Sequence, residues 1–315
     1  MARMSGREFD RRMNRLVRRR AGSAPARAET APTQAPADRS REIAELAEAV
    51  ADEHCPIGIV SPAAIAADKD ITISFGHYGD AFDGMLEHME GWSDRRSLGV
   101  GGFHIYCNLD RLGQRDAPRA RFTLAHELGH YFIDEHRLAL AGGRAQAHGS
   151  SCEYESPVLA EQEADLFAAN LLMPRRRFLD KAKSVSPGLA GVLKLAGAFG
   201  TSVIATALRY VDADLRPCAA VKWDWRGYAW KLLSTSAFRA YFRTTFQSPD
   251  DLPADCPTRR ALAHETPPEC GYFQAGTIAS AWFPRIAQGQ WRDVIFIEQA
   301  MPLGRFGVLT LLYPQ

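Results

Sequence analysis

Two histidines and a glutamate in the pattern H-E-x-x-H, at His126, Glu127 and His130, constrain the fold of this 315-residue chain most strongly. Apolar residues surround the motif, among them Leu124 and Leu128, which predicts a buried helix. On an α-helix, residues i and i+4 lie on one face, so both imidazoles can point at a single ion. Glu127 is turned by about 100° from His126 and can reach a water beside the ion without ligating the ion. Because burying these three side chains together without a metal would be costly, we expect a metal site.

A site with two histidines needs a third ligand, and segment 160–167 offers carboxylates for it. Glu161 and Asp165 are four residues apart and share a helix face. We expect Glu161 to bind the ion and Asp165 to accept the outer N–H of a ligand histidine. Glu163 lies about 200° round the helix from Glu161 and is expected to be exposed. Two imidazoles, one carboxylate and an open fourth position suit a hydrolytic Zn²⁺, one per chain.

A hydrolytic site of this kind also needs a donor for the oxyanion that forms during peptide hydrolysis. The sequence offers Tyr154 and His148 as possible oxyanion donors, with Tyr131 and His136 as further candidates. The pattern does not choose among the four.

The surrounding pattern predicts an α+β fold in which a small antiparallel sheet precedes the metal-binding helices. Helical periodicity at 41–53 and a proline start at 62–68 predict two helices. Period-two alternation predicts strands at 71–75 and 103–108, and a turn at 83–85 leads into another strand.

Helix-boundary signals bracket both metal-binding helices. Asp116-Ala117-Pro118 starts the first helix, which we expect to end near residue 134. Ser156 as cap and Pro157 at the first helical position start the second helix, which Pro174 ends. Residues 137–156 are rich in Ala, Gly and Ser and are predicted to be a loop.

We divide the chain into four parts. Residues 1–40 form a disordered basic tail and residues 41–180 a peptidase-like domain. Residues 181–214 form a helix-turn-helix-like segment, and residues 215–315 a C-terminal mixed β-rich domain for sensing or docking. Residues 1–41 hold eleven arginines and four acidic residues, and the stretch that follows the arginines is too poor in large apolar groups to fold.

The predicted helix pair at 188–211 is broken at Gly200-Thr201-Ser202 and resembles a helix-turn-helix. A DNA-reading helix should offer basic or amide side chains to base edges. Between Ser202 and Val211 only Arg209 qualifies. We therefore favour a packing element, and direct DNA binding is not expected.

Composition excludes several classes of protein. Lys+Arg 38 against Asp+Glu 37 gives a net charge of +1, which does not fit a strongly basic nucleic-acid binder. No stretch approaches 18 uninterrupted apolar residues, and the basic N-terminus lacks the apolar core of a secretory signal. The six cysteines are scattered, as in a reducing cytoplasm. We expect a cytoplasmic protein with no membrane partner.

Three segments together carry a family resemblance: Arg121–His130, Glu161–Ala168 and Leu171–Pro174. They resemble the ImmA/IrrE family of zinc peptidases over roughly 41–215. The resemblance implies a zincin-like fold with a gluzincin-like ligand set, in which His126, His130 and Glu161 bind zinc and Glu127 is the catalytic base. The interval between His130 and Glu161 is long for the family, and the basic tail lies outside its core.

The resemblance also implies a function, because the best-known family members cleave a helix-turn-helix repressor and so induce stress or mobile-element genes. We therefore predict a metalloendopeptidase that acts on a regulatory protein, with such a repressor as the expected substrate. The alternatives are a DNA-binding transcription regulator that uses the peptidase fold as a scaffold and an antitoxin-like module that binds a small partner.

Overall fold

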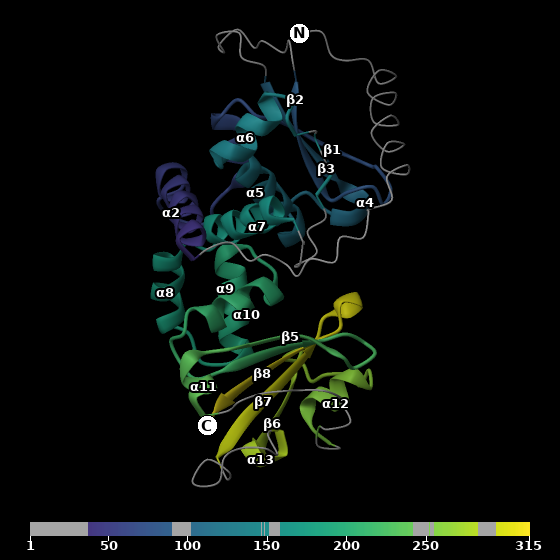
Figure 1. Cartoon of the computed structure of the whole chain (residues 1–315). Helices are drawn as coiled ribbons and strands as arrows, with labels where there is room; N and C mark the ends of the chain where they lie inside the picture. The colour runs from purple at the N-terminus through teal and green to yellow at the C-terminus, as the bar shows by residue number, and fades with distance from the viewer. Residues whose placement is uncertain are drawn as a thin grey trace. The chain divides into compact units, whose positions relative to one another are not determined.

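The computed structural model describes residues 37–89, 102–145, 147, 149–150, 158–241, 252, 255–282 and 294–315. The α+β fold class is confirmed (Figure 1). The chain forms two compact units, 1–174 and 175–315, which are described separately. This division places the helices of 181–214 in the same unit as the C-terminal sheet. Residues 1–36 of the predicted tail lie outside the described residues, and its last four residues already belong to a helix that begins at Ala37.

The first unit contains a three-stranded sheet of β1 (Thr72–Gly76), β2 (Gly84–Met89) and β3 (Gly102–Asn108), in the order β1-β3-β2. Strand β2 runs antiparallel to β3, with Gly84 opposite Cys107. Strand β1 runs parallel to β3, so the prediction of an antiparallel sheet is wrong for this pair. The reason is the strand order, since β3 returns from β2 into the centre of the sheet and there meets β1 in the same direction.

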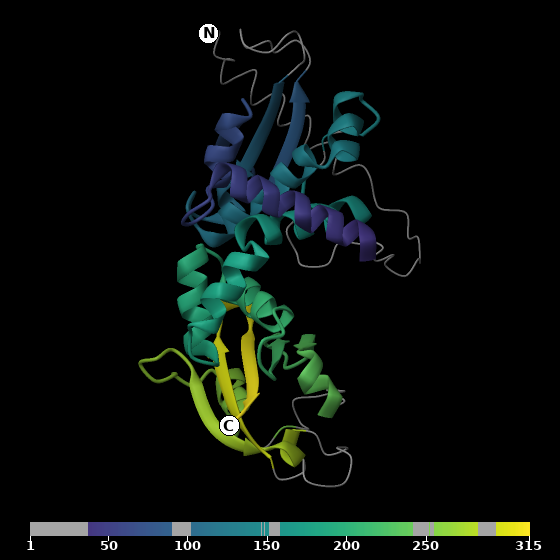
Figure 2. The same cartoon turned by 90° about the vertical axis from the view of Figure 1, so that its left-hand side faces the viewer.

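Helices cover this sheet and cross one another beside it. Their bounds are α2 (Ala37–His54), α3 (Pro62–Asp68), α4 (Leu109–Leu112), α5 (Pro118–Phe132), α6 (Asp134–Ala141) and α7 (Leu159–Leu172). Helix α5 packs against β2 and β3, α7 packs against α5, and α2 lies along α7 (Figures 1 and 2). Ile43 of α2, Leu128 of α5, Leu171 of α7 and Ile105 of β3 share one core. The H-E-x-x-H motif therefore lies on α5, the helix between the sheet and α7.

The second unit joins helices to a five-stranded antiparallel sheet with the order β5-β4-β8-β7-β6. Its elements are α8 (Arg175–Lys183), α9 (Leu189–Phe199), α10 (Val203–Asp212), β4 (Ala219–Trp223), β5 (Ala229–Ser234), α11 (Ser236–Tyr241), α12 (Pro257–Leu262), β6 (Phe273–Ile278), α13 (Ala279–Trp282), β7 (Ile295–Pro302), η2 (Gly304–Phe306) and β8 (Val308–Pro314). Trp223 and Phe296 belong to its separate core.

The predicted helix pair at 188–211 is present as α9 and α10, with a break at Gly200 and with Ser202 capping α10. Helix α10 packs against β4 and β5, and the backbone N–H of Leu189 donates to Gln299 on β7. These contacts explain why the pair belongs to the sheet's unit. No single helix among the described residues is long and apolar enough to span a membrane; α9 and α10 pass that test only as a pair bent by 109°.

Candidate metal centre

The two helices that carry the predicted ligands cross closely because α5 has a glycine at the crossing. A Cβ atom on Gly129 would lie 3.0 Å from the Cα of Ala164 on α7, so a larger residue would push the helices apart. Helix α5 begins at Pro118 as predicted. Helix α7 begins at Leu159 rather than at the predicted Ser156-Pro157, which lie outside the described residues.

His126, His130 and Glu161 converge on one point and form a buried group that could hold a metal ion. The two Nε2 atoms are 3.2 Å apart. Glu161 places Oε2 3.3 Å from the Nε2 of His126 and Oε1 3.1 Å from the Nε2 of His130. Ligands bound to zinc at about 2.0–2.1 Å in tetrahedral geometry lie about 3.3 Å from one another. The spacing and the donor types therefore fit a tetrahedral ion.

Asp165 lies behind His126, where its Oδ1 is 2.8 Å from Nδ1. This hydrogen bond holds the ring proton on Nδ1 and leaves the Nε2 lone pair free for an ion. Burial acts to lower the pKa of His126, but hydrogen bonds to Asp165 and Glu161 and the charge of Glu127 raise it to about 10. The site therefore attracts positive charge to this point, as a divalent cation would supply.

Glu127 is buried beside the three converging side chains and is not one of them. Its Oε1 accepts a 2.5 Å hydrogen bond from the Ser150 hydroxyl, and the backbone of Ser150 bridges to Gly84 at the start of β2. A Cβ on Gly84 would lie 2.8 Å from that same Oε1. Strand β2 and Ser150 thus fix the carboxylate of Glu127 in place.

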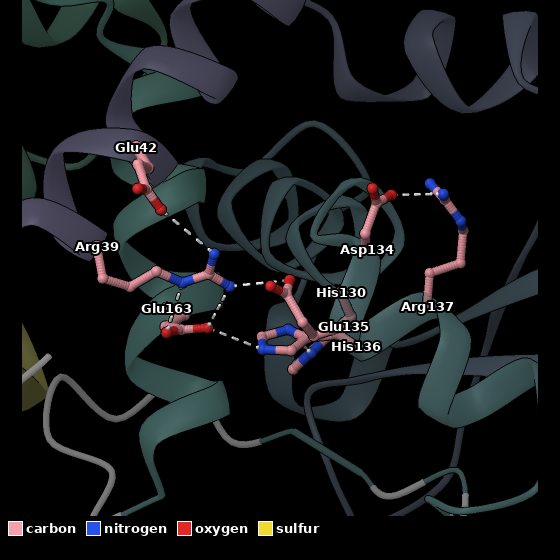
Figure 3. A network of polar contacts seen from close by, with 8 residues as sticks. All are labelled: Arg39, Glu42, His130, Asp134, Glu135, His136, Arg137 and Glu163. Carbon is pink, nitrogen blue, oxygen red and sulfur yellow. Dashed lines mark hydrogen bonds and ion pairs between the residues drawn. The ribbon is translucent and has the colours of Figure 1, made fainter.

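Glu163 is buried, so the prediction that it is exposed is wrong. Its carboxylate binds Arg39 of α2 and the Nε2 of His136 on α6 (Figure 3). Helix α6 occupies part of the segment predicted to be a loop. Helical periodicity predicts the direction in which a side chain points, but it does not predict which elements distant in sequence pack against that side chain. Here α2 and α6 cover this face of α7.

Of the four candidate oxyanion donors, Tyr154 and His148 lie outside the described residues. The Tyr131 ring packs edge-on against Phe103, with ring centroids 5.2 Å apart. His136 lies behind His130 with its two ring nitrogens next to His130 and Glu163. His136 therefore contacts a ligand from its outer side.

Three residues that contact the site, Ser150, Gly84 and Arg39, were not predicted from the sequence. Ser150 and Gly84 are 66 residues apart, and Arg39 and Glu163 are 124 residues apart. No local pattern signals such pairs. The one available signal was the Asp83-Gly84 turn, because a glycine at a strand start often marks close approach of another group.

Comparison with known proteins agrees with this geometry. Residues 113–210 match the sequence model of Peptidase M78, the IrrE N-terminal-like domain. Comparison with curated proteins gives no match. A solved structure described as a Mycobacterium tuberculosis transcriptional regulator is similar in fold, with a TM-score of 0.51 and 14% identity, over 88% of this chain and 78% of that chain. The match spans all the converging side chains, so this part of the chain is similar to the IrrE N-terminal-like domain of Peptidase M78.

Proposed function

We propose that this protein is a zinc-dependent endopeptidase that cleaves a regulatory protein. The observation that carries the proposal is the convergence of His126, His130 and Glu161 beside the buried carboxylate of Glu127, within a domain matched by a peptidase family. A helix-turn-helix repressor in the cytoplasm is the substrate that the family resemblance favours, and its cleavage would induce stress or mobile-element genes.

The chemistry of the residues follows from their positions. Zinc, when bound by the two histidines and Glu161, supplies Lewis acidity that polarises a carbonyl and activates water. Glu127 takes the proton of the attacking water and passes it to the leaving amine. Ser150 donates to Glu127 and so orients the carboxylate for both transfers. Asp165 orients His126 through its Nδ1.

A second candidate is a transcription regulator that uses the peptidase fold as a scaffold, and the description of the similar solved structure favours it. The side chain of Arg209, the one basic residue of α10, is only 11% exposed and pairs with Asp212 at 3.3 Å. This arrangement leaves little of Arg209 for base edges and supports the peptidase over a DNA reader.

The test compares wild type with Glu127→Ala and with Glu53→Gln, a control that changes an exposed carboxylate of the same unit. The substrate is the repressor encoded nearest to this gene, with zinc content measured alongside cleavage. We expect wild type and Glu53→Gln to cleave it, and Glu127→Ala to lose at least about 100-fold in rate while keeping its zinc. Equal cleavage by Glu127→Ala would refute the assigned base. Sequence-specific, salt-dependent duplex binding without cleavage would favour the second candidate.

A further inference from the structure

A line of polar contacts leads away from the metal centre on the side of His130 (Figure 3). The Nδ1 of His130 is 3.2 Å from the Nδ1 of His136. The Nε2 of His136 is 3.0 Å from Oε2 of Glu163. Arg39 then places Nε 3.1 Å from Oε1 of Glu163 and Nη2 3.0 Å from Glu135. Four side chains from α2, α6 and α7 thus connect to one ligand histidine of α5.

The protons in this line have one consistent arrangement when His130 binds an ion through Nε2. A neutral His130 must then carry its proton on Nδ1. Since two facing nitrogens can share only one proton, the Nδ1 of His136 accepts it. The proton of His136 is therefore on Nε2, where the Glu163 carboxylate accepts it. The opposite tautomer of His136 would set N–H against N–H and a lone pair against a carboxylate.

We propose that His136, Glu163 and Arg39 are positioning residues that hold His130 in the tautomer able to bind the ion. The proposal rests on the metal site of the proposed function. The two histidines are then oriented in different ways. His126 is hydrogen-bonded directly to the carboxylate of Asp165, whereas His130 is linked to the carboxylate of Glu163 through the imidazole of His136. Such outer partners fix ring orientation and raise the basicity of the ligand.

Burial makes this line more than a surface ion pair. The side chain of Glu163 is 7% exposed and that of His136 is 10% exposed. A buried carboxylate is stable only with partners for its charge. Arg39, which is 28% exposed at the outer end of the line, supplies that charge. We therefore expect tight zinc binding to require the charged side chains of Glu163 and Arg39 and the hydrogen bonds of His136.

The test uses two substitutions of similar size at His136 in the full-length protein. His136→Leu removes the acceptor for the His130 N–H, and His136→Asn keeps an acceptor oxygen near the position of Nδ1. Zinc affinity is measured by competition with a chromophoric chelator. We expect His136→Leu to weaken zinc binding by roughly 10–100-fold and His136→Asn to restore part of that loss, because Asn accepts from His130 but does not extend to Glu163.

Asp134→Asn is the matched control, because it breaks the exposed Asp134–Arg137 pair on the same helix without touching the line (Figure 3). It should bind zinc as wild type does. Circular dichroism verifies that each variant is folded. Should His136→Leu not fold, Arg39→Gln at the exposed end of the line serves instead, and it should weaken zinc binding by several-fold.

Two results would overturn the inference. The first is wild-type zinc affinity in His136→Leu, or in Arg39→Gln where that variant replaces it. The second is an equal loss of zinc affinity in His136→Leu and His136→Asn. Both leave the proposed function intact if wild type binds zinc and cleaves its substrate. Failure of wild type to bind zinc would instead remove the metal site on which both proposals depend.

Discussion

At the scale of single residues, the absence of a side chain at Gly84 matters as much as the presence of Glu127. A Cβ at position 84 would lie 2.4 Å from Cγ2 of Thr123 and 2.8 Å from Oε1 of Glu127. Neither neighbour can move freely, because both are buried on α5. Strand β2 therefore approaches α5 closely enough to restrict the position of the Glu127 carboxylate.

We predict that Gly84→Ala displaces Glu127 and lowers kcat/KM by roughly 10–100-fold, because small errors in the position of a catalytic group are costly. Zinc affinity should be unchanged, since the three ligands lie elsewhere on α5 and α7. Gly197→Ala is the control, because a Cβ there meets nothing within 4 Å. Wild-type activity in Gly84→Ala would show that Glu127 is not held by this contact.

At the scale of secondary-structure elements, Asp83 joins the start of β2 to two helices. Its carboxylate is fully buried and accepts from Arg111 of α4 at 2.6 Å and from Arg119 of α5 at 2.8 Å. Burial acts to raise the pKa of Asp83, but the two arginines outweigh it and lower the pKa below its usual value. This charge cluster holds β2 in place beside α5.

We predict that Asp83→Asn lowers the free energy of unfolding by about 3 kcal/mol near neutral pH, because two half-buried guanidinium groups lose their counter-charge. Since the folded-state pKa is lowered, the stabilisation by Asp83 is complete above the unfolded-state pKa of about 3.9 and is lost as pH falls through the folded-state value. Denaturant unfolding at several pH values should show that the difference in unfolding free energy between wild type and Asp83→Asn shrinks below about pH 4. A difference that grows on acidification would contradict this account.

The sequence predicted the elements whose pattern is local. Helix α5 and the break between α9 and α10 follow from proline, glycine and the period of apolar residues, and the convergence of His126 with His130 follows from their four-residue spacing. The burial of Glu163 and the contact of Ser150 with Glu127 did not follow, because both depend on elements far apart in the chain. Helix α6 was missed because it is only eight residues long and leads directly into a segment rich in Ala, Gly and Ser.

At the scale of the whole molecule, the proposed ligands, the proposed base and the line of contacts from His130 to Arg39 all belong to the first unit. The second unit has its own core and its own sheet. The family match runs from 113 to 210 and so includes α8, α9 and most of α10 of the second unit, whereas the resemblance noted from the sequence began near residue 41. A bound metal should therefore stabilise the first unit directly.

We predict that calorimetry of the full chain shows two unfolding transitions and that a zinc chelator lowers the midpoint of one of them. A ligand at 1,000 times its Kd stabilises the unit that binds it by about 4 kcal/mol. Asp83→Asn should lower the same transition, which identifies it as that of the first unit. Equal shifts of both transitions on chelation would contradict the assignment of the site to one unit.

The most direct test of the central claim is anomalous diffraction at the zinc absorption edge from crystals of the zinc-saturated protein. The account predicts one strong peak within about 2.0–2.2 Å of the Nε2 atoms of His126 and His130 and of a Glu161 oxygen. A zinc-saturated crystal with no peak among these three side chains, or with its zinc held by other residues, would contradict it.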